Sequence, residues 1–355
     1  MVAQDARWIA DALQSTQRHR SGSGWLPLVL NGHSARIVYE GSAALLSPDP
    51  NVGVPPLAAL LEDRFANVIA RARHAGKLLD DTKKSYAQLR EELGAFYAAH
   101  RQEFSGNAVR LARWLESDLG LFSAPGGRIL GSTITGQFRL GVSSEAGLAD
   151  LGPRLFEVAQ EQGGALAVLS AAAGDTTPPL STFDYAALGR MVGKDRKAAK
   201  YLAGRYDPVM SFETKLLLLM VEGEVNTTDV LLPLTESGHE EAVFRARVVS
   251  TFHALRAVEE VLASAPSAQA SGTGRVRALL SEPSTRQMVD DARARRVRNR
   301  CMHYEIRGGS VVLDPHQPMF GIVEALWPER SFEELNADVR AINARLAEAL
   351  RLWRN

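Results

Sequence analysis

The chain has 355 residues, 45% of them hydrophobic, and its 41 lysines and arginines balance its 41 aspartates and glutamates. A chain of this length and composition is expected to be globular, with a sizeable core and two domains. Because the net charge is zero, bulk charge gives no argument for nucleic-acid binding, which would have to rest on a local basic patch.

The chain also lacks the patterns of several common classes of protein. Its single cysteine, Cys301, excludes an intrachain disulfide and a multi-thiolate zinc site. No apolar run approaches the roughly 20 residues that span a bilayer, and residues 1–20 lack a signal-peptide core. No HExxH, phosphate-binding loop or GxGxxG unit is present. We therefore expect a cytoplasmic protein with no membrane partner, no metal and no cofactor.

The first half of the sequence alternates helical patterns with stretches rich in glycine. Apolar residues at helical spacing predict helices at 1–20, within 55–122 and at 145–173. β-Branched and aromatic residues between turn formers favour strand or irregular structure at 25–41 and a hairpin at 123–141. The expected elements are a short helix at 1–20, strand or irregular structure at 25–41, helices within 55–122, a hairpin at 123–141, a helix at 145–173 and a linker at 175–181.

The second half is predicted to be almost entirely helical. Ser211 with Thr214, Ser284 with Gln287, and Ser331 with Glu334 each give a full or partial capping box, which marks the start of a helix. Glycines and prolines interrupt the helical pattern at 306–321, where we expect a second hairpin. The expected elements are a helix from Ser211, a long helix at 239–266, a flexible loop at 267–274, short and longer helices at 275–281 and 284–305, a hairpin at 306–321 and a last helix from 331 to about 353.

These elements predict a mainly α protein with short β-hairpins. We place a mostly helical domain at 1–180 and a helical domain at 181–355 with its core at about 239–355. The sequence does not identify the role of the first domain, for which sensor or regulator is one option. The proline-containing stretch at 175–181 is the natural boundary between them.

The stretch RRVRNRCMHYE, residues 295–305, carries the candidate chemistry. On a helix, Asn299 and His303 are four residues apart and share a face, whereas Arg298 is rotated by about 140° from His303 and must reach around with its long side chain. Histidine serves as general acid or base near neutral pH. Arginine suits the stabilisation of phosphate charge. Asn299 would orient the histidine or bind the phosphate.

The pattern Arg298-Asn299-x-x-x-His303 resembles the R-x4-6-H signature of the HEPN superfamily, in which a polar residue often follows the arginine. The resemblance covers roughly the last third of the chain. It implies a helical bundle, a homodimer formed through that bundle, and a metal-independent endoribonuclease such as a toxin or an antiviral defence effector. Members modified by an antitoxin place a tyrosine two residues after the histidine. Here Tyr304 directly follows His303, so the sequence departs from the pattern of the members that an antitoxin modifies. The sequence identifies neither an antitoxin nor a trigger.

Other residues near the motif have two interpretations. Arg293, Arg295, Arg296 and Arg300 either hold the RNA backbone or form a solvated basic face. His253 and Arg256, one turn apart on the helix predicted at 239–266, either support the site or are a core-edge histidine and a solvated arginine, and Tyr304 is a third supporting candidate. Cys301 is a nucleophile only if its surroundings activate the thiol, and it fits a small core residue as well.

Three functions follow from these residues. The first is RNA cleavage by attack of the 2′-hydroxyl, with His303 as acid or base and Arg298 stabilising phosphate charge. The alternative is a non-catalytic, HEPN-like helical protein that binds a partner or acts as a scaffold. An unrelated small-molecule enzyme built in a helical bundle is the third.

Overall fold

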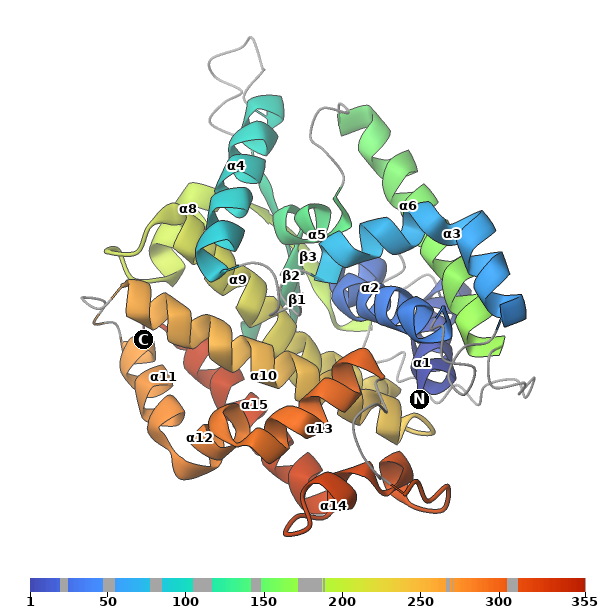
Figure 1. The fold of residues 1–355 in the computed structure, drawn as a ribbon. Coiled ribbons are helices and arrows are strands. Elements are labelled where there is room, and N and C mark those ends of the chain that lie inside the picture. Colours follow the sequence, from blue (N-terminus) through green and yellow to red (C-terminus); the bar gives the residue numbers. More distant parts are fainter. Residues whose placement is uncertain are drawn as a thin grey trace.

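The computed structural model describes residues 1–19, 25–46, 55–76, 85–104, 117–141, 148–171, 187, 189–265, 269, 271–304 and 312–354. Helices dominate these residues and one small sheet accompanies them, so the mainly α fold class is confirmed (Figure 1). The linker predicted at 175–181 lies outside the described residues.

Most of the first half is helical and forms a group on one side of the molecule (Figure 1). α2 contacts α1, α3 and α6, while α4 packs against α9 of the second half. The bounds are α1 Val2–His19, α2 Leu26–Leu45, α3 Pro55–Ala75, α4 Tyr86–Phe104, α5 Thr133–Leu140 and α6 Leu148–Ala171.

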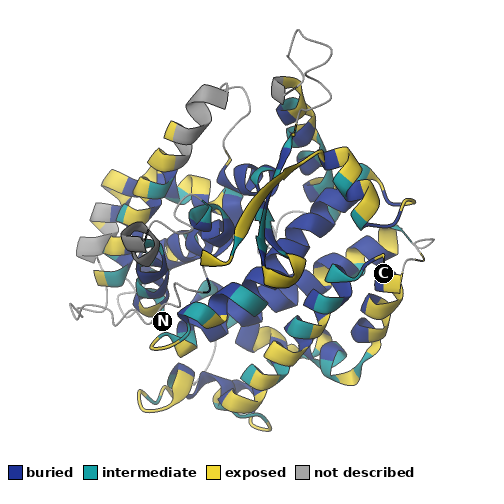
Figure 2. Ribbon diagram, turned by 180° about the vertical axis from the view of Figure 1, so that it is seen from behind, coloured by how far each residue is buried: buried dark blue, intermediate teal, exposed yellow. Residues whose placement is uncertain are grey.

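A three-stranded antiparallel sheet has the order β2-β1-β3. The hairpin predicted at 123–141 is only partly correct: β1 Leu119–Ala124 and β2 Arg128–Ser132 flank a tight turn at 125–127, whereas residues 133–140 form the helix α5. Gly126 has a φ of 77° there, a conformation that favours glycine. The hairpin ends where Ser132 caps α5. β3 Val192–Arg196, which the sequence did not predict, pairs with β1, and each of its residues is exposed (Figure 2).

The second half wraps shorter helices around three long ones. The predicted caps Ser211 and Ser331 are confirmed, since each accepts a hydrogen bond from the backbone three residues on. The long helix predicted at 239–266 is confirmed as α10. The bounds are α8 Ala198–Arg205, α9 Phe212–Asn226, α10 Glu240–Ser264, α11 Ser271–Ser281, α12 Pro283–Asp290, α13 Ala292–His303, α14 Ile322–Leu326 and α15 Phe332–Arg351, with the irregular turns η4 Thr227–Leu231, η5 Leu232–Thr235 and η6 Pro318–Gly321.

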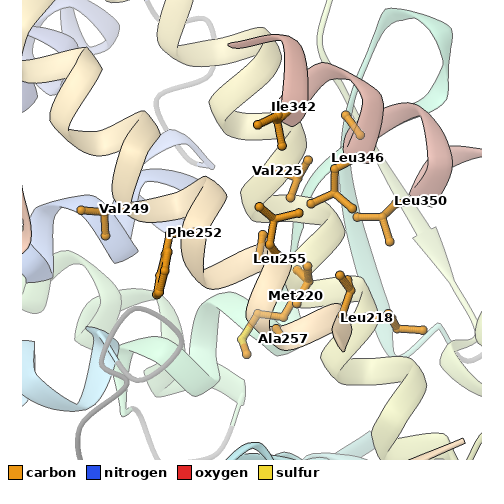
Figure 3. Close-up of a cluster of buried hydrophobic side chains, with 14 of the residues drawn as sticks. Leu218, Met220, Val225, Val249, Phe252, Leu255, Ala257, Ile342, Leu346 and Leu350 are labelled. Carbon is orange, nitrogen blue, oxygen red and sulfur yellow. The ribbon is translucent and has the colours of Figure 1, made fainter. Parts of the chain in front are cut away.

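The larger hydrophobic core lies between α9, α10 and α15. Leu218, Met220 and Val225 of α9 meet Leu255 of α10 and Leu346 of α15 (Figure 3). A second core joins α1, α2, α3 and α6, and it also includes Leu231, Leu232 and the beginning of α10. Both cores thus draw residues from both sides of position 180, while the domain boundary itself stays a prediction.

The expectation of strand or irregular structure at 25–41 is wrong, because these residues form α2. Side chains are buried almost all round this helix, including Asn31, His33, Arg36 and Glu40. A helix buried on every side shows no alternation of polar and apolar faces, so its β-branched and aromatic residues were misleading. Pro27 in the first turn is compatible with a helix start.

Two further expectations in the second half need correction. The single helix predicted at 284–305 is two helices, because Asp291 is extended and caps α13, and α12 begins at Pro283 after Glu282 rather than at Ser284. In the second expected hairpin, residues 312–321 form turns and η6 instead of a strand, and residues 305–311 lie outside the described residues. α11 begins at Ser271, inside the stretch expected to be a loop.

A buried polar cluster ties α2 to α5 and to the central helices. Glu224 of α9 accepts hydrogen bonds from Arg139 and Ser250, at 2.8 and 2.7 Å, and lies 3.4 Å from His33 Nε2. Burial would raise the pKa of Glu224, but Arg139 and His33 lower it to about 2. Burial lowers the pKa of His33 to about 4, against the attraction of Glu224. His33 is therefore neutral in the folded protein near pH 7.

This assignment predicts how stability depends on pH. The pKa of His33 is about 4 in the folded chain and 6.5 ordinarily, so between these values the unfolded chain binds more protons. The contribution to the free energy of unfolding is full above pH 6.5 and falls as the pH drops towards 4, by about 3 kcal/mol in all. In the variant His33→Gln, the free energy of unfolding, measured with denaturant at a series of pH values, should not show this decrease. The exposed-site variant His316→Gln should keep it, and equal pH slopes for wild type and His33→Gln would contradict the assignment.

Candidate functional site

The helix α13 carries the Arg-Asn-x-x-x-His motif and lies against two different parts of the molecule. Along its length it packs on α10, and its C-terminal end contacts α2 (Figure 1). Asp291 begins the helix by accepting a hydrogen bond from the Arg293 N–H. The motif is therefore held between the central helices and the N-terminal group.

Arg298 points inward from α13. Its side chain is buried, and the guanidinium carbon lies 4.4 Å from the centre of the Phe252 ring on α10. At this distance the arginine cation is attracted to the aromatic face. In one chain, Arg298 thus joins α13 to α10 and does not lie on the surface with His303.

His303 ends α13 and is partly exposed. Its side chain retains 29% of its accessible surface, and Nδ1 lies 3.0 Å from Oε2 of Glu40, a largely buried carboxylate of α2. Asn299, one turn earlier, is also partly buried. Glu40 was missed from the sequence, because the stretch that contains it was not expected to be a helix.

Arg36, one turn before Glu40 on α2, binds the end of α13 as well. Its Nη1 donates to the carbonyl oxygen of Cys301 at 2.9 Å and to the Tyr304 hydroxyl at 3.1 Å. The last carbonyls of a helix have no partner within the helix, so a guanidinium there both satisfies and electrostatically stabilises the C-terminus. Tyr304 follows the helix with a φ of 52°, a conformation uncommon for a residue other than glycine.

A buried carboxylate, Asp5 of α1, connects these groups. It accepts hydrogen bonds from Arg36 Nη2 at 2.7 Å, Arg245 Nε at 2.8 Å and the Tyr304 hydroxyl at 2.6 Å. Burial alone would raise the pKa of Asp5, but the charges of Arg245 and Arg36 hold it below its usual range. We call Asp5, Arg36, Arg245 and Tyr304 the buried charge cluster. It joins α1, α2, α10 and the residue that follows α13.

Two candidate residues next to the motif have surroundings that suit structural roles. Burial raises the pKa of Cys301 to about 12, so its thiol is not an activated nucleophile. Burial likewise raises the pKa of Tyr304 well above its ordinary value, and its hydroxyl is engaged in the buried charge cluster.

The arginines predicted to bind RNA differ in exposure. Arg295 and Arg296 are exposed, and Arg300 is partly exposed. Arg293 forms ion pairs with Asp291 and Glu329, at 2.8 and 2.9 Å, so its charge is partly balanced. The exposed basic surface of α13 therefore centres on Arg295 and Arg296.

The side chains of His253 and Arg256 contact other residues of α10. His253 is buried on α10 and stacks edge-on against Phe252. Arg256 is exposed and pairs with Glu259 at 2.9 Å. His253 is thus surrounded by the core, whereas Arg256 is exposed to solvent.

Comparisons of the chain with protein-family models, with curated proteins and with solved structures gave no match. Within the described ranges, no three or more histidine, cysteine or acidic side chains are grouped so that they could hold a metal ion. None of the described helices combines the length and apolarity that crossing a membrane requires.

The buried charge cluster predicts a large cost for removing its carboxylate. Asp5→Ala would leave Arg36 and Arg245 buried with their main counter-charge gone, and should lower the free energy of unfolding by about 3–5 kcal/mol. Arg345→Ala, which breaks a half-exposed ion pair with Glu282, should cost less than about 1 kcal/mol. Urea unfolding measures both. A cost for Asp5→Ala no larger than that of the control would refute the structural role of the cluster.

Proposed function

We propose that this chain is a metal-independent endoribonuclease of the HEPN type, with His303 as its acid–base group. The observation that carries the proposal is that His303 ends a basic helix, keeps 29% of its side-chain surface, and is held by a carboxylate through Nδ1. The exposed Arg295 and Arg296 on the same helix are suited to bind the phosphate backbone of RNA. A wider role as a toxin or antiviral effector in the cytoplasm is part of the proposal.

The proposed reaction needs no group beyond the RNA and the protein. A base takes the proton of the ribose 2′-hydroxyl, and the oxygen attacks the adjacent phosphorus. The bond to the 5′-oxygen breaks, an acid protonates that oxygen, and a 2′,3′-cyclic phosphate remains. Arg298 and Asn299 complete the proposed catalytic set. Arg298 would stabilise the charge of the phosphate, and Asn299 would orient the imidazole.

The proposal includes a homodimer formed through the C-terminal bundle. Two copies related by a twofold axis would bring two His303 side chains to one phosphate, one as base and the other as acid.

One observation favours a second function, that of a non-catalytic helical protein that binds a partner or serves as a scaffold. Arg298 is buried over Phe252, where its contacts join two helices instead of facing solvent. In that case the motif would stabilise the bundle, and the exposed basic surface would bind a partner without cleaving it.

Cleavage of RNA in the presence of EDTA tests the first function. Purified full-length protein should cut tRNA, rRNA or mRNA and leave 2′,3′-cyclic phosphate ends. His303→Ala should lower the rate by about 10²–10⁴-fold, because it removes the acid–base group. His316→Ala, which changes an exposed histidine away from α13, is the matched control and should retain the wild-type rate.

Arg298→Ala separates the two functions. A catalytic Arg298 predicts a rate loss of about 10²–10³-fold with a folded protein. A purely structural Arg298 predicts loss of stability in urea, with little change in the rate of the fraction that remains folded. Cleavage that survives His303→Ala unchanged would refute the role assigned to the histidine.

Light scattering tests the homodimer. Full-length protein should have the mass of a dimer at concentrations on the order of tens of micromolar. A monomer across this range, with RNA cleavage still present, would contradict a site shared between two copies.

A further inference from the structure

We infer that Glu40, a residue of the N-terminal helix α2, is the positioning residue for His303. For its effect on catalysis the inference rests on the proposed function, whereas its structural part can be tested without activity. It assigns α2, which lies outside the helical bundle that carries the motif, a direct part in building the site.

The contact itself defines the protonation pattern of the imidazole. Glu40 is only about a tenth exposed, and its Oε2 lies 3.0 Å from His303 Nδ1. An ionised carboxylate accepts hydrogen bonds and cannot donate them, so Nδ1 must carry the proton. The neutral imidazole is then held with Nε2 as the nitrogen that takes and returns protons. The same division of roles, in which a carboxylate orients a histidine base, is found in hydrolytic triads.

The position of Glu40 is fixed by its own helix. Arg36 and Glu40 are four residues apart, so they share one face of α2, and this face meets the end of α13. Arg36 binds the Cys301 carbonyl oxygen and the Tyr304 hydroxyl, while Glu40 binds His303. Two residues on one face therefore fix both the last turn of α13 and the ring of its last residue.

The backbone after His303 supports the same arrangement. Tyr304 holds a φ of 52°, and its hydroxyl lies 2.6 Å from the buried Asp5 carboxylate. Left-handed backbone at a non-glycine residue carries an energetic cost, which the hydroxyl contacts offset. Tyr304 is therefore fixed in place directly after His303, whose imidazole lies against Glu40.

A spectroscopic experiment separates positioning from a merely structural ion pair. Full-length protein labelled with ¹⁵N-histidine is studied by NMR at a pH where its imidazoles are neutral, and the His303 signals are assigned from their loss in His303→Ala. In wild type we expect the proton on Nδ1. In Glu40→Ala the population should shift to the Nε2–H form, which predominates in a solvated imidazole. In Glu40→Gln, whose amide oxygen still accepts from Nδ1, the wild-type form should largely persist.

Kinetics then measures the consequence for catalysis. Glu40→Ala should lower kcat by about 10- to 100-fold, less than loss of the imidazole itself, while the KM for RNA changes by less than about twofold. Glu40→Gln should retain more of the rate than Glu40→Ala, because it keeps the orientation. Glu348→Gln, an exposed carboxylate of α15 paired with Arg351, is the matched control and should behave as wild type.

The outcomes distinguish this inference from the proposed function. An unchanged His303 tautomer in a folded Glu40→Ala protein overturns the inference, whether or not the wild type cleaves RNA. A shifted tautomer supports it, and if wild type then fails to cleave RNA, the endoribonuclease proposal alone is lost. A shifted tautomer with kcat unchanged would overturn the catalytic part of the positioning role. The signal of His316 serves as the internal reference, and it should be the same in all variants.

Discussion

The arrangement around the motif depends on the ion pairs and the hydrogen bond that the Asp5 carboxylate forms. It is fully buried and balances two guanidiniums, Arg36 from α2 and Arg245 from α10, while also accepting from Tyr304. Two buried arginines without this counter-charge would be strongly unfavourable, so α1 cannot be displaced independently of the other elements. Through Tyr304 the same carboxylate holds the residue that follows α13. The beginning of the sequence thereby takes part in shaping the surroundings of a motif carried by its last third.

The features predicted correctly from the sequence are those determined by neighbouring residues. The caps at Ser211 and Ser331 follow from hydrogen bonds to backbone three residues away, and the long stripe of apolar residues on α10 follows from helical periodicity. The hairpin before α5 has its turn at Gly126, which is a local signal as well. The motif could be found for the same reason, since Arg298, Asn299 and His303 are within six positions of one another.

The partners that hold the end of α13 could not be predicted, because they come from the other end of the chain. Glu40 is 263 residues from His303, and Asp5 is 240 residues from Arg245. One local signal was present: His33, Arg36 and Glu40 are spaced by three and four residues, as on one face of a helix. The β-branched residues between them favoured strand, and only burial on all sides explains why α2 is nonetheless a helix. The break at Asp291 was missed because a capping aspartate within a polar stretch resembles any exposed residue of a longer helix.

The geometry of α13 also limits what the motif does within one chain. Positions five apart on a helix differ by about 140°, and the two side chains follow this divergence, Arg298 towards Phe252 of α10 and His303 towards Glu40 of α2. A twofold pairing of two copies would bring two histidines together, yet it would not by itself release Arg298 from beneath the bundle surface. The exposed guanidiniums of α13 are instead those of Arg295 and Arg296, about two turns before His303. Direct contact by Arg298 would require giving up its place over Phe252, a stacking interaction worth up to about 2 kcal/mol when desolvated. One charge-stabilising donor contributes about 3–4 kcal/mol to a transition state, so the loss of the Phe252 contact would offset about half of what direct contact by Arg298 would add.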